Sequence, residues 1–451
     1  MFKIEELVKV TLGTLSNALN YGHLSGFSID SRSIKKGDCF IAIKGNNFDG
    51  HNFIDEAIQK GASCIVSQVS CDLCHVSCDI PFILVQDTTR ALGDIARFIR
   101  TKFDIPVIAI SGSNGKTTAK EMVAWVLSKK FKVLKNEGTK NNHIGLPQTL
   151  LNLDASYDIA VLELGTNHFN EIDYLSNICL PNIGIITNIG PSHLEYFKNL
   201  QGVFKEKYSL INNLKKPSIG ILNSDDALLR KKITGKAGPR PIFSFGINKK
   251  SDFLAQEIKL VRGELEFSVN SKCRINLKTP GLHNIYNCLA AVSVARLFGM
   301  SYDDIAERFS LFDFPQGRLK VMERDRIIFI DDTYNSNPAS FKHALSALNS
   351  FQTCGRKIVV MGDMLELGDE KEELHKRAGE EAAKVCDIFI TVGELARLSA
   401  DVAKSQGISN TFSCCSCDEV KEILYKQILI RENDIILVKG SRSMKMEGVL
   451  R

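Results

Sequence analysis

The 451-residue sequence lacks any apolar run close to the ~20 residues that a membrane-spanning helix needs. Its first six residues include glutamates at positions 5 and 6, where a secretory leader has its apolar stretch. Neither charge sign is in excess, since 57 Lys and Arg face 52 Asp and Glu and the net charge is only +5. So small a surplus does not indicate nucleic-acid binding. We expect a cytoplasmic protein that neither inserts into membranes nor binds nucleic acid.

Long disorder and a disulfide framework are not expected either. The composition of 44% hydrophobic and 24% charged residues is that of an ordinary globular protein. The 13 cysteines are an odd number in a chain without a secretory leader, which favours reduced thiols. Cys71, Cys74, His75 and Cys78 superficially suggest zinc, but no second Cys/His pair follows at zinc-finger spacing. We expect a cysteine-rich loop there, as at Cys414–Cys417.

The length predicts about three domains at roughly 150 residues each, and the patterning divides the chain accordingly. Residues 1–85 mix short apolar runs with turn-forming residues, which predicts a small N-terminal α/β domain. Residues 86–313 alternate buried-strand runs with helical segments, which predicts a parallel sheet covered on both faces. The alternation restarts in residues 314–451, as in a doubly wound, Rossmann-like domain. The predicted strands cover residues 106–110, 158–163, 182–187, 326–330, 357–361, 387–391 and 434–438.

The strongest local signal is Ser111-Gly-Ser-Asn-Gly-Lys-Thr-Thr118, between the predicted strand 106–110 and a helix-compatible segment. Strand, glycine loop, Lys-Thr and helix follow the order of a phosphate-binding loop. The loop is shorter than the standard pattern, because Ile110 stands where its first glycine is expected. Glycines let backbone N–H groups approach phosphate oxygens, Lys116 can reach the outer phosphates, and the Thr117 hydroxyl can bind Mg²⁺. The sequence therefore predicts a nucleoside triphosphate site.

Two further residues follow predicted strands of the same domain. Glu163 ends the strand 158–163, and His193 comes shortly after the strand 182–187. Strand ends of a parallel sheet open onto the ligand crevice, where a carboxylate and an imidazole could hold a divalent metal beside the phosphates. Taken alone, each residue is more often an ordinary surface or capping residue.

A series of motifs, in order along nearly the whole chain, closely resembles those of the Mur ligases. They are Asp30-Ser-Arg32, Phe40–Gly45, Asp49-Gly-His51, Gly112–Thr118, Glu137–Pro147, Glu163–His168, Asn188–Glu195, Gly281–Asn287, Gly317-Arg318, Asp331–Pro338, Gly362–Gly368 and Lys439–Met444. Within this family the chain looks like the ligases that add D-alanyl-D-alanine. The diaminopimelate-adding ligases carry Asn-Pro-Arg, whereas Ala339 follows Asn337-Pro338 here.

This resemblance implies an α/β fold of three domains: an N-terminal UDP-sugar-binding domain, a central P-loop ATPase-like domain and a C-terminal Rossmann-like domain that binds the incoming dipeptide. It also implies a reaction. ATP phosphorylates the terminal carboxylate of a UDP-N-acetylmuramoyl-tripeptide, and the amine of D-alanyl-D-alanine attacks the acyl phosphate. The expected enzyme is a monomer of cytoplasmic peptidoglycan precursor synthesis that uses ATP and two Mg²⁺ ions.

The resemblance further assigns roles to individual residues. The catalytic residues would be Lys116, His193 and Lys207, and the metal ligands Thr117, Glu163, His193 and Lys207. The nucleotide would be bound by Gly112, Ser113, Asn114, Gly115, Lys116, Thr117, Thr118, Asn284, Arg318, Asp332 and Asn335. The muramoyl substrate would be bound by Ser31, Arg32, Lys44, Gly45, His51 and Asn142. In isolation, Asn284 could equally be a helix cap, and Asp332 and Asn335 loop-turn residues.

The family carries a lysine carbamylated by CO₂, and the resemblance places it at Lys207. Phe204 and Glu206 stand where the family has small residues, so Lys205 remains an alternative. The third residue of the tripeptide, diaminopimelate or lysine, is also left open.

Two other functions compete with this interpretation. Folylpolyglutamate synthases share the phosphate loop and the ligase chemistry, but they are not expected to carry the Asp30–Arg32 and Asp49–His51 motifs. In a nucleotide-gated binding protein, the loop would control a partner surface, and ATP binding would not be coupled to phosphate release.

Overall fold

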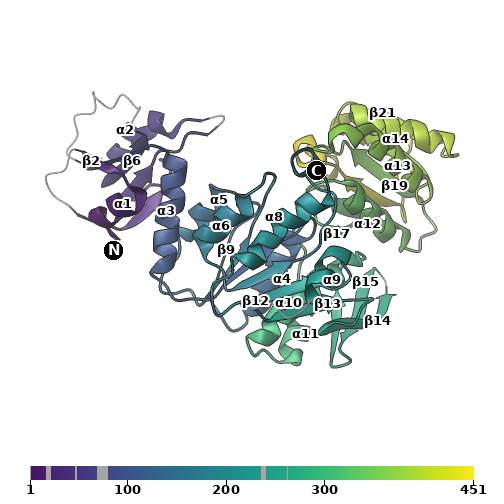
Figure 1. The fold of residues 1–451 in the computed structure, drawn as a ribbon. Helices are drawn as coiled ribbons and strands as arrows, with labels where there is room; N and C mark the ends of the chain where they lie inside the picture. Colours follow the sequence, from purple (N-terminus) through teal and green to yellow (C-terminus); the bar gives the residue numbers. More distant parts are fainter. Residues whose placement is uncertain (1, 17–21, 46–47, 69–79, 235–239, 262) are drawn as a thin grey trace.

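The computed structural model describes the chain except residues 1, 17–21, 46–47, 69–79, 235–239 and 262. The Cys71–Cys78 cluster lies outside the described residues. Three main α/β units follow one another along the chain (Figure 1), and each contains a sheet of mainly parallel strands. The predicted fold class is thereby confirmed. Among the described residues, no helix combines the length and apolarity needed to cross a membrane.

The N-terminal sheet has the order β2-β7-β6-β5-β4, in which only the β2–β7 pair is antiparallel. A separate antiparallel pair, β1 and β3, lies beside it. The elements are β1 Phe2–Lys3, α1 Ile4–Thr11, β2 Thr14–Ser16, β3 His23–Leu24, β4 Gly26–Ser28, β5 Asp38–Ile41, α2 Ile54–Gln59, β6 Cys64–Gln68, β7 Phe82–Val85 and α3 Thr88–Thr101. Helix α3 packs against α1 and also against α5 and α6 of the central unit, so it joins the two.

The central sheet has the order β16-β15-β14-β13-β12-β11-β8-β10-β9. Strands β8 to β14 pair in parallel, whereas β14, β15 and β16 form an antiparallel extension. The elements are β8 Val107–Ser111, α4 Lys116–Leu127, β9 Val133–Lys135, α5 Gly145–Leu150, β10 Ile159–Glu163, α6 Glu171–Cys179, β11 Ile183–Ile186, α7 Leu194–Phe197, α8 Leu200–Asn212, β12 Ile219–Asn223, α9 Ala227–Ile233, β13 Ile242–Gly246, β14 Phe253–Val261, β15 Glu264–Val269, β16 Cys273–Leu277, α10 His283–Leu297 and α11 Tyr302–Ser310.

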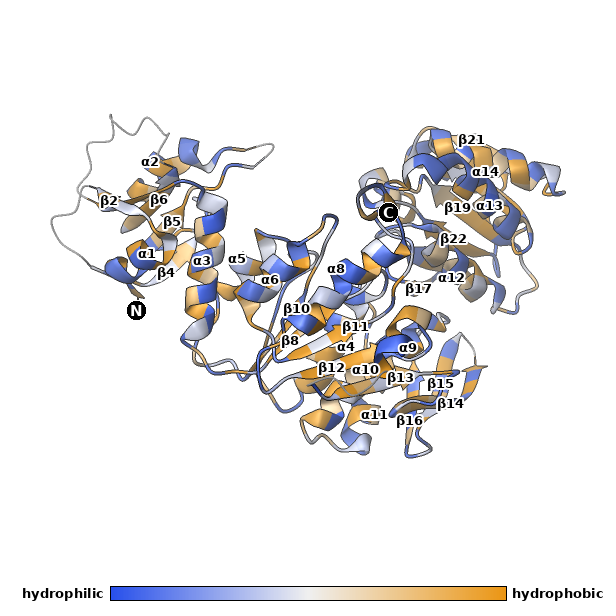
Figure 2. Cartoon of the chain, viewed as in Figure 1, coloured by the Kyte–Doolittle hydropathy of each residue, from blue (hydrophilic) through white to orange (hydrophobic). Residues whose placement is uncertain are grey.

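Both faces of this sheet are covered, as predicted. Side chains alternate along each strand, so Ile108 and Ile110 of β8 pack with α4 and α10, whereas Val107 and Ala109 pack on the opposite side with α3, α5 and α6. Figure 2 shows apolar residues concentrated on the central strands and polar residues on outer helices such as α9. Buried strands explain the continuous apolar runs in the sequence.

The C-terminal sheet has the order β17-β18-β22-β19-β20-β21, in which only β17 is antiparallel. The elements are β17 Lys320–Arg324, β18 Ile327–Asp332, α12 Pro338–Asn349, β19 Lys357–Gly362, η2 Gly368–Glu370, α13 Lys371–Ala383, β20 Ile388–Val392, α14 Glu394–Ser405, β21 Asn410–Cys414, α15 Cys417–Glu422, η3 Ile423–Gln427, β22 Ile435–Lys439, η4 Arg442–Met444 and η5 Met446–Leu450. Helix α12 starts sharply, because the Asn337 side chain accepts from Ser340 N and Pro338 occupies the first turn.

The sole tryptophan, Trp125, is on α4. It packs against the segment through which the chain leaves the central unit after α11. Its Nε1–H donates to the carbonyl of Arg308 at 2.7 Å, and the Arg308 guanidinium stacks 3.7 Å from the ring centroid. Phe312, on the segment after α11, contacts the same ring edge-on. These contacts fix the start of the connection to the C-terminal unit against α4.

Asp434 stabilises the C-terminal unit from a buried position before β22. The carboxylate accepts from the Arg356 guanidinium at 2.6 Å and from the backbone N–H groups of Arg356 and Arg431. Burial raises the pKa of Asp434, but these hydrogen bonds outweigh it, so the net pKa is lowered. Because the folded-state pKa lies below the unfolded value, the carboxylate stabilises the fold above about pH 4, and this contribution fades as pH falls through the folded pKa.

Asp434→Ala is therefore expected to lower the free energy of unfolding by about 3 kcal/mol at pH 7, since it leaves the Arg356 guanidinium without its carboxylate. The difference from wild type should shrink below pH 4. Urea unfolding followed by circular dichroism measures both effects. Asp418→Ala, whose carboxylate is 91% exposed in the same unit, is the control and should change stability by less than about 0.5 kcal/mol. Equal free energies of unfolding for the two variants would contradict the stabilising role of Asp434.

Candidate active site

The phosphate loop turns between β8 and α4 with its backbone held against the loop that follows β11. Ser113 Oγ donates to Gly190 O at 2.8 Å, and Asn114 N donates to Asn188 Oδ1 at 3.0 Å. Gly115 has φ +82°, and a Cβ at this position would collide with the Asn287 side chain. The glycine is thus required by both conformation and space. The predicted strand, loop and helix order is confirmed locally.

Lys116 begins α4 and lies folded over its own loop. Its Nζ donates to Gly112 O at 2.9 Å and to Ser113 O at 3.3 Å. Burial lowers the pKa of Lys116, while the charge of Glu163 raises it. A cation held above converging backbone N–H groups at a helix N-terminus can bind phosphate oxygens. Thr117 and Thr118 follow in the first turn and are buried.

Glu163 at the end of β10 has the chemistry of a magnesium ligand. Its Oε1 accepts from Asn141 Nδ2 at 2.7 Å, but its buried Oε2 has no hydrogen-bond donor within the described part of the chain. An unpaired carboxylate oxygen on the same cavity lining as Lys116 and Thr117 fits a hard cation that also binds phosphate. In the described ranges no three His, Cys, Asp or Glu side chains converge on one point.

The other predicted metal ligands lie around the same loop in different environments. His193 caps α7 with φ +50° and lines the cavity, and its Nδ1 lies 2.9 Å from the Glu366 carboxylate. Lys207 on α8 is only 1% exposed and lies behind the lining rather than on it. Burial and the charge of Lys116 lower the pKa of Lys207 well below its ordinary value, against the opposing charge of Glu206. Lys205 points to the exposed side of α8.

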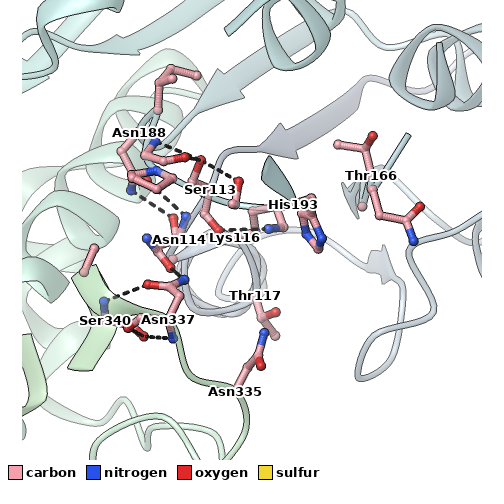
Figure 3. A pocket seen from close by; sticks show the side chains of 18 of the residues that line it. Ser113, Asn114, Lys116, Thr117, Thr166, Asn188, His193, Asn335, Asn337 and Ser340 are labelled. Atoms are coloured by element: carbon pink, nitrogen blue, oxygen red, sulfur yellow. Dashed lines mark hydrogen bonds between the residues drawn. The ribbon is translucent and has the colours of Figure 1, made fainter. Parts of the chain in front are cut away.

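The C-terminal unit faces the phosphate loop directly. Arg318 Nη2 donates to Thr117 Oγ1 at 3.1 Å while its guanidinium stacks 3.6 Å from the Tyr334 ring centroid. Asn337 Nδ2 donates to Asn114 Oδ1 at 2.9 Å, and Figure 3 shows Asn337 and Ser340 opposite Asn114. Residues more than 200 positions apart thus meet over one loop.

Asp332 and Asn335 are held by a cation that the sequence analysis did not single out. Lys439, buried at the end of β22, lies 2.5 Å from Asp332 Oδ2 and donates to Asn335 O at 2.8 Å. Burial raises the pKa of Asp332, and Lys439 and Arg318 oppose that shift. The Lys439–Met444 motif was noticed in the sequence, but only the pairing of β18 with β22 brings Lys439 to Asp332.

These residues line a single cavity of about 1030 Å³ between the central and C-terminal units. Its volume is at the upper end of the range for ligand pockets, roughly 300–1000 Å³. The predicted residues on its lining are Ser113, Asn114, Gly115, Lys116, Thr117, Thr118, Asn142, Glu163, His193, Asn284, Arg318, Asp332 and Asn335. Asn141, Asn188, Tyr334, Asn337 and Lys439 also line it and were missed as site residues.

Asn284 lies deep in the cavity on α10. Its Nδ2 donates to Thr279 Oγ1 at 3.4 Å, and its Oδ1 accepts from Asn287 Nδ2 at 3.0 Å. His283 beside it is buried, and burial together with neighbouring cations lowers the pKa of His283 to about 3, so its imidazole is neutral. His343 on α12 packs against it with ring centroids 5.2 Å apart.

The predicted muramoyl-substrate residues of the N-terminal unit are not brought to this cavity. Ser31 Oγ donates to Glu56, and Arg32 forms a 2.7 Å ion pair with Asp30 while its side chain stays 83% exposed. His51 is engaged on both ring nitrogens, by Asp49 at 2.6 Å and by Gln68 N at 3.1 Å. Lys44 lies 3.9 Å from Asp49, and Gly45 closes the same turn. Their role in binding stays a prediction.

Comparison with protein-family models matches three consecutive parts of the chain. Residues 23–100 match the Mur ligase family catalytic domain, residues 110–295 the Mur ligase middle domain, and residues 317–442 the Mur ligase glutamate ligase domain. Each of the three matches falls within one of the three α/β units of the fold.

Relatives that match nearly the whole chain indicate the same family. The UDP-N-acetylmuramoyl-tripeptide–D-alanyl-D-alanine ligase of Escherichia coli is 35% identical over 99% of this chain and 98% of its own. The Bacillus subtilis enzyme of the same name is 32% identical over 99% and 97%. Among solved structures, MurF from Acinetobacter baumannii superimposes with a TM-score of 0.87 at 30% identity, covering 100% of this chain and 98% of its own. MurF from Thermotoga maritima, solved with ADP, gives 0.83 at 29% identity over 94% and 96%. The chain therefore belongs to the Mur ligase family.

Proposed function

We propose that this protein is an ATP-dependent amide ligase of the MurF type, which joins D-alanyl-D-alanine to a UDP-N-acetylmuramoyl-tripeptide in peptidoglycan precursor synthesis. The carrying observation is the phosphate loop covered directly by Arg318 and Asn337 of the C-terminal unit. It occurs in a chain whose 35% identical relative bears that activity in its name. A carboxylate is a poor electrophile, so phosphorylation by ATP supplies the leaving group, and water must be excluded from the acyl phosphate.

The residues that line the cavity would have distinct roles in this reaction. Backbone N–H groups of the loop and Lys116 bind the transferring phosphate and offset its growing charge. Arg318 and Asn337 approach from the other side and close the site. Mg²⁺, when bound, would neutralise phosphate charge and polarise the transferred phosphoryl group. The free Glu163 oxygen and the Thr117 hydroxyl would hold one ion, and His193 with a carbamylated Lys207 a second.

The remaining parts of the proposal extend this assignment to the rest of the molecule. Residues 1–85 would bind the UDP-sugar through Ser31, Arg32 and neighbouring residues, residues 86–313 would bind ATP, and residues 314–451 would bind the dipeptide. The enzyme would act as a monomer in the cytoplasm, where its nucleotide-linked substrate is made, and its product would serve cell-wall formation and hence cell shape and division.

The test is release of inorganic phosphate by the purified protein against a panel of UDP-muramoyl peptides and dipeptides. Phosphate release is expected only when ATP, Mg²⁺, a UDP-N-acetylmuramoyl-tripeptide and D-alanyl-D-alanine are all present, with one amide formed per ATP. Including lysine and diaminopimelate tripeptides identifies the third residue. Release with folate and glutamate would instead indicate a folylpolyglutamate synthase. ATP binding without coupled release would indicate a nucleotide-gated binding protein.

A further inference from the structure

The loop Asp363–Gly368 follows β19 in the C-terminal unit. Its Glu366 side chain reaches the central unit. The Glu366 carboxylate lies 2.9 Å from His193 Nδ1 of the central unit. Two residues later the chain passes so close to α7 that a Cβ on Gly368 would lie 3.8 Å from Glu195 N. The loop therefore presents Glu366 to the edge of the phosphate site.

Hydrogen bonds within the C-terminal unit hold the backbone of this loop. Met364 N donates to His375 Nε2 at 3.0 Å, and Leu365 N donates to Ser441 Oγ at 2.9 Å. His375 is fully buried, and burial lowers its pKa. Because Nε2 accepts from Met364 N, the ring proton is on Nδ1, which lies 2.6 Å from Lys371 O and donates to it. Glu366 itself has φ +61°, a left-handed conformation that is uncommon for a residue other than glycine. Such backbone strain is retained where the surroundings enforce it, and it often accompanies a binding role.

Most other carboxylates around the cavity already have partners. Glu171 accepts from the backbone N–H groups of Asn167 and His168, and Asp332 is paired with Lys439. Asp225 accepts from Ile247 N after β13, and Asp226 accepts from Leu228 N in the first turn of α9. Glu366 is 56% exposed, and its Oε2 lies 2.9 Å from His193 Nδ1. Glu370 also lines the cavity, but the described ion pair to His193 is made by Glu366. The unpaired oxygens Glu163 Oε2 and Asp225 Oδ1 are buried, whereas Glu366 is more than half exposed, so Glu366 is the more accessible carboxylate for an incoming cation.

The surface next to Glu366 is apolar. Leu365 is 40% exposed, and Leu365, Leu367 and Leu374 all line the cavity. A negative charge beside small apolar patches suits a ligand with an ammonium group and methyl side chains. D-alanyl-D-alanine has both, and at neutral pH its amino group is an ammonium ion that needs an anionic partner.

We propose that Glu366 binds the ammonium group of the incoming D-alanyl-D-alanine and, with Leu365 and Leu367, forms the acceptor subsite. This inference rests on the proposed function, because it assumes that acceptor. The competing explanation is that Glu366 only orients His193 as a metal ligand. The two explanations differ in which half of the reaction they affect.

The experiment compares Glu366→Gln with Glu372→Gln, which removes an exposed carboxylate on α13 away from the cavity. Two reactions are measured on the full-length enzyme with ATP, Mg²⁺ and the UDP-tripeptide. One is ligation of D-alanyl-D-alanine. The other is trapping by hydroxylamine, a neutral amine that attacks the acyl carbon, releases phosphate and leaves a hydroxamate.

Glu366→Gln is expected to raise the KM for D-alanyl-D-alanine about tenfold or more while the rate of hydroxamate formation stays within about twofold of wild type. Glu372→Gln should change neither. An equal loss in both reactions would assign Glu366 to His193 and overturn the proposal, as would an unchanged KM. Failure of the proposed function would look different, because the wild-type enzyme would then form no hydroxamate from this tripeptide.

Discussion

Lys116→Met should lower the kcat of ligation about 10³-fold or more while the protein stays folded. Lys116 holds the carbonyls of Gly112 and Ser113, at the position where transferring phosphate would lie. Methionine keeps the length of the stem and removes the charge that offsets the developing phosphate anion. Steady-state phosphate release measures the loss, and thermal unfolding checks the fold.

Lys404→Met on the exposed face of α14 is the matched control for loss of one lysine charge. It should retain full activity. A Lys116→Met enzyme that unfolds like wild type and turns over at a near-normal rate would remove Lys116 from the phosphate site.

Lys207→Ala is expected to lower activity about 100-fold or more, and Lys205→Ala less than threefold. Only an uncharged amine adds CO₂, and burial together with the charge of Lys116 lowers the pKa of Lys207 in that direction. The resulting carbamate would be an anion with oxygen donors suited to Mg²⁺, whereas an ammonium would repel the ion. Acetate or formate at high concentration should partly restore Lys207→Ala by supplying the missing carboxylate.

Lys207→Arg separates carbamylation from simple charge, because it keeps a cation that cannot add CO₂ and should be as inactive as Lys207→Ala. A direct readout is the ¹³C NMR signal of a carbamate in wild-type enzyme equilibrated with ¹³C-bicarbonate, absent in Lys207→Arg. An essential Lys205 with a dispensable Lys207 would move the modification by two residues. If neither mattered, there would be no modified lysine.

The helical spacing of the residues around Lys207 indicates its burial, which the motif alone does not. Helix α8 buries Val203, Glu206, Lys207, Leu210 and Ile211, which is the three-and-four spacing of one helix face. That spacing places Lys207 among apolar residues and Lys205 on the exposed side. The antiparallel extension β14–β16 was not predicted either. Its residues also follow a periodic pattern, because many of them alternate between more buried and more exposed positions.

Local patterns predicted the phosphate loop, because strand, turn and helix there follow from a short stretch of residues. The partners of that loop could not be predicted in this way. Asn337 meets Asn114 across 223 residues, and Lys439 meets Asp332 across 107, through the packing of one domain on another and the order of strands in a sheet. Motif resemblance assigned roles to Asp332 and Asn335 but none to Lys439, the buried lysine that holds them.

The packing of Trp125 has a practical consequence for every experiment above. As the only tryptophan, it makes the intrinsic fluorescence of this enzyme a signal from one place, the junction of α4 with the segment that leads to the C-terminal unit. Its emission depends on the Arg308 guanidinium stacked on the ring and on the hydrogen bond from Nε1. A stopped-flow trace in the presence of nucleotide would therefore report movement at that junction without any label, and variants of distant surface residues could be screened for it in the same cuvette.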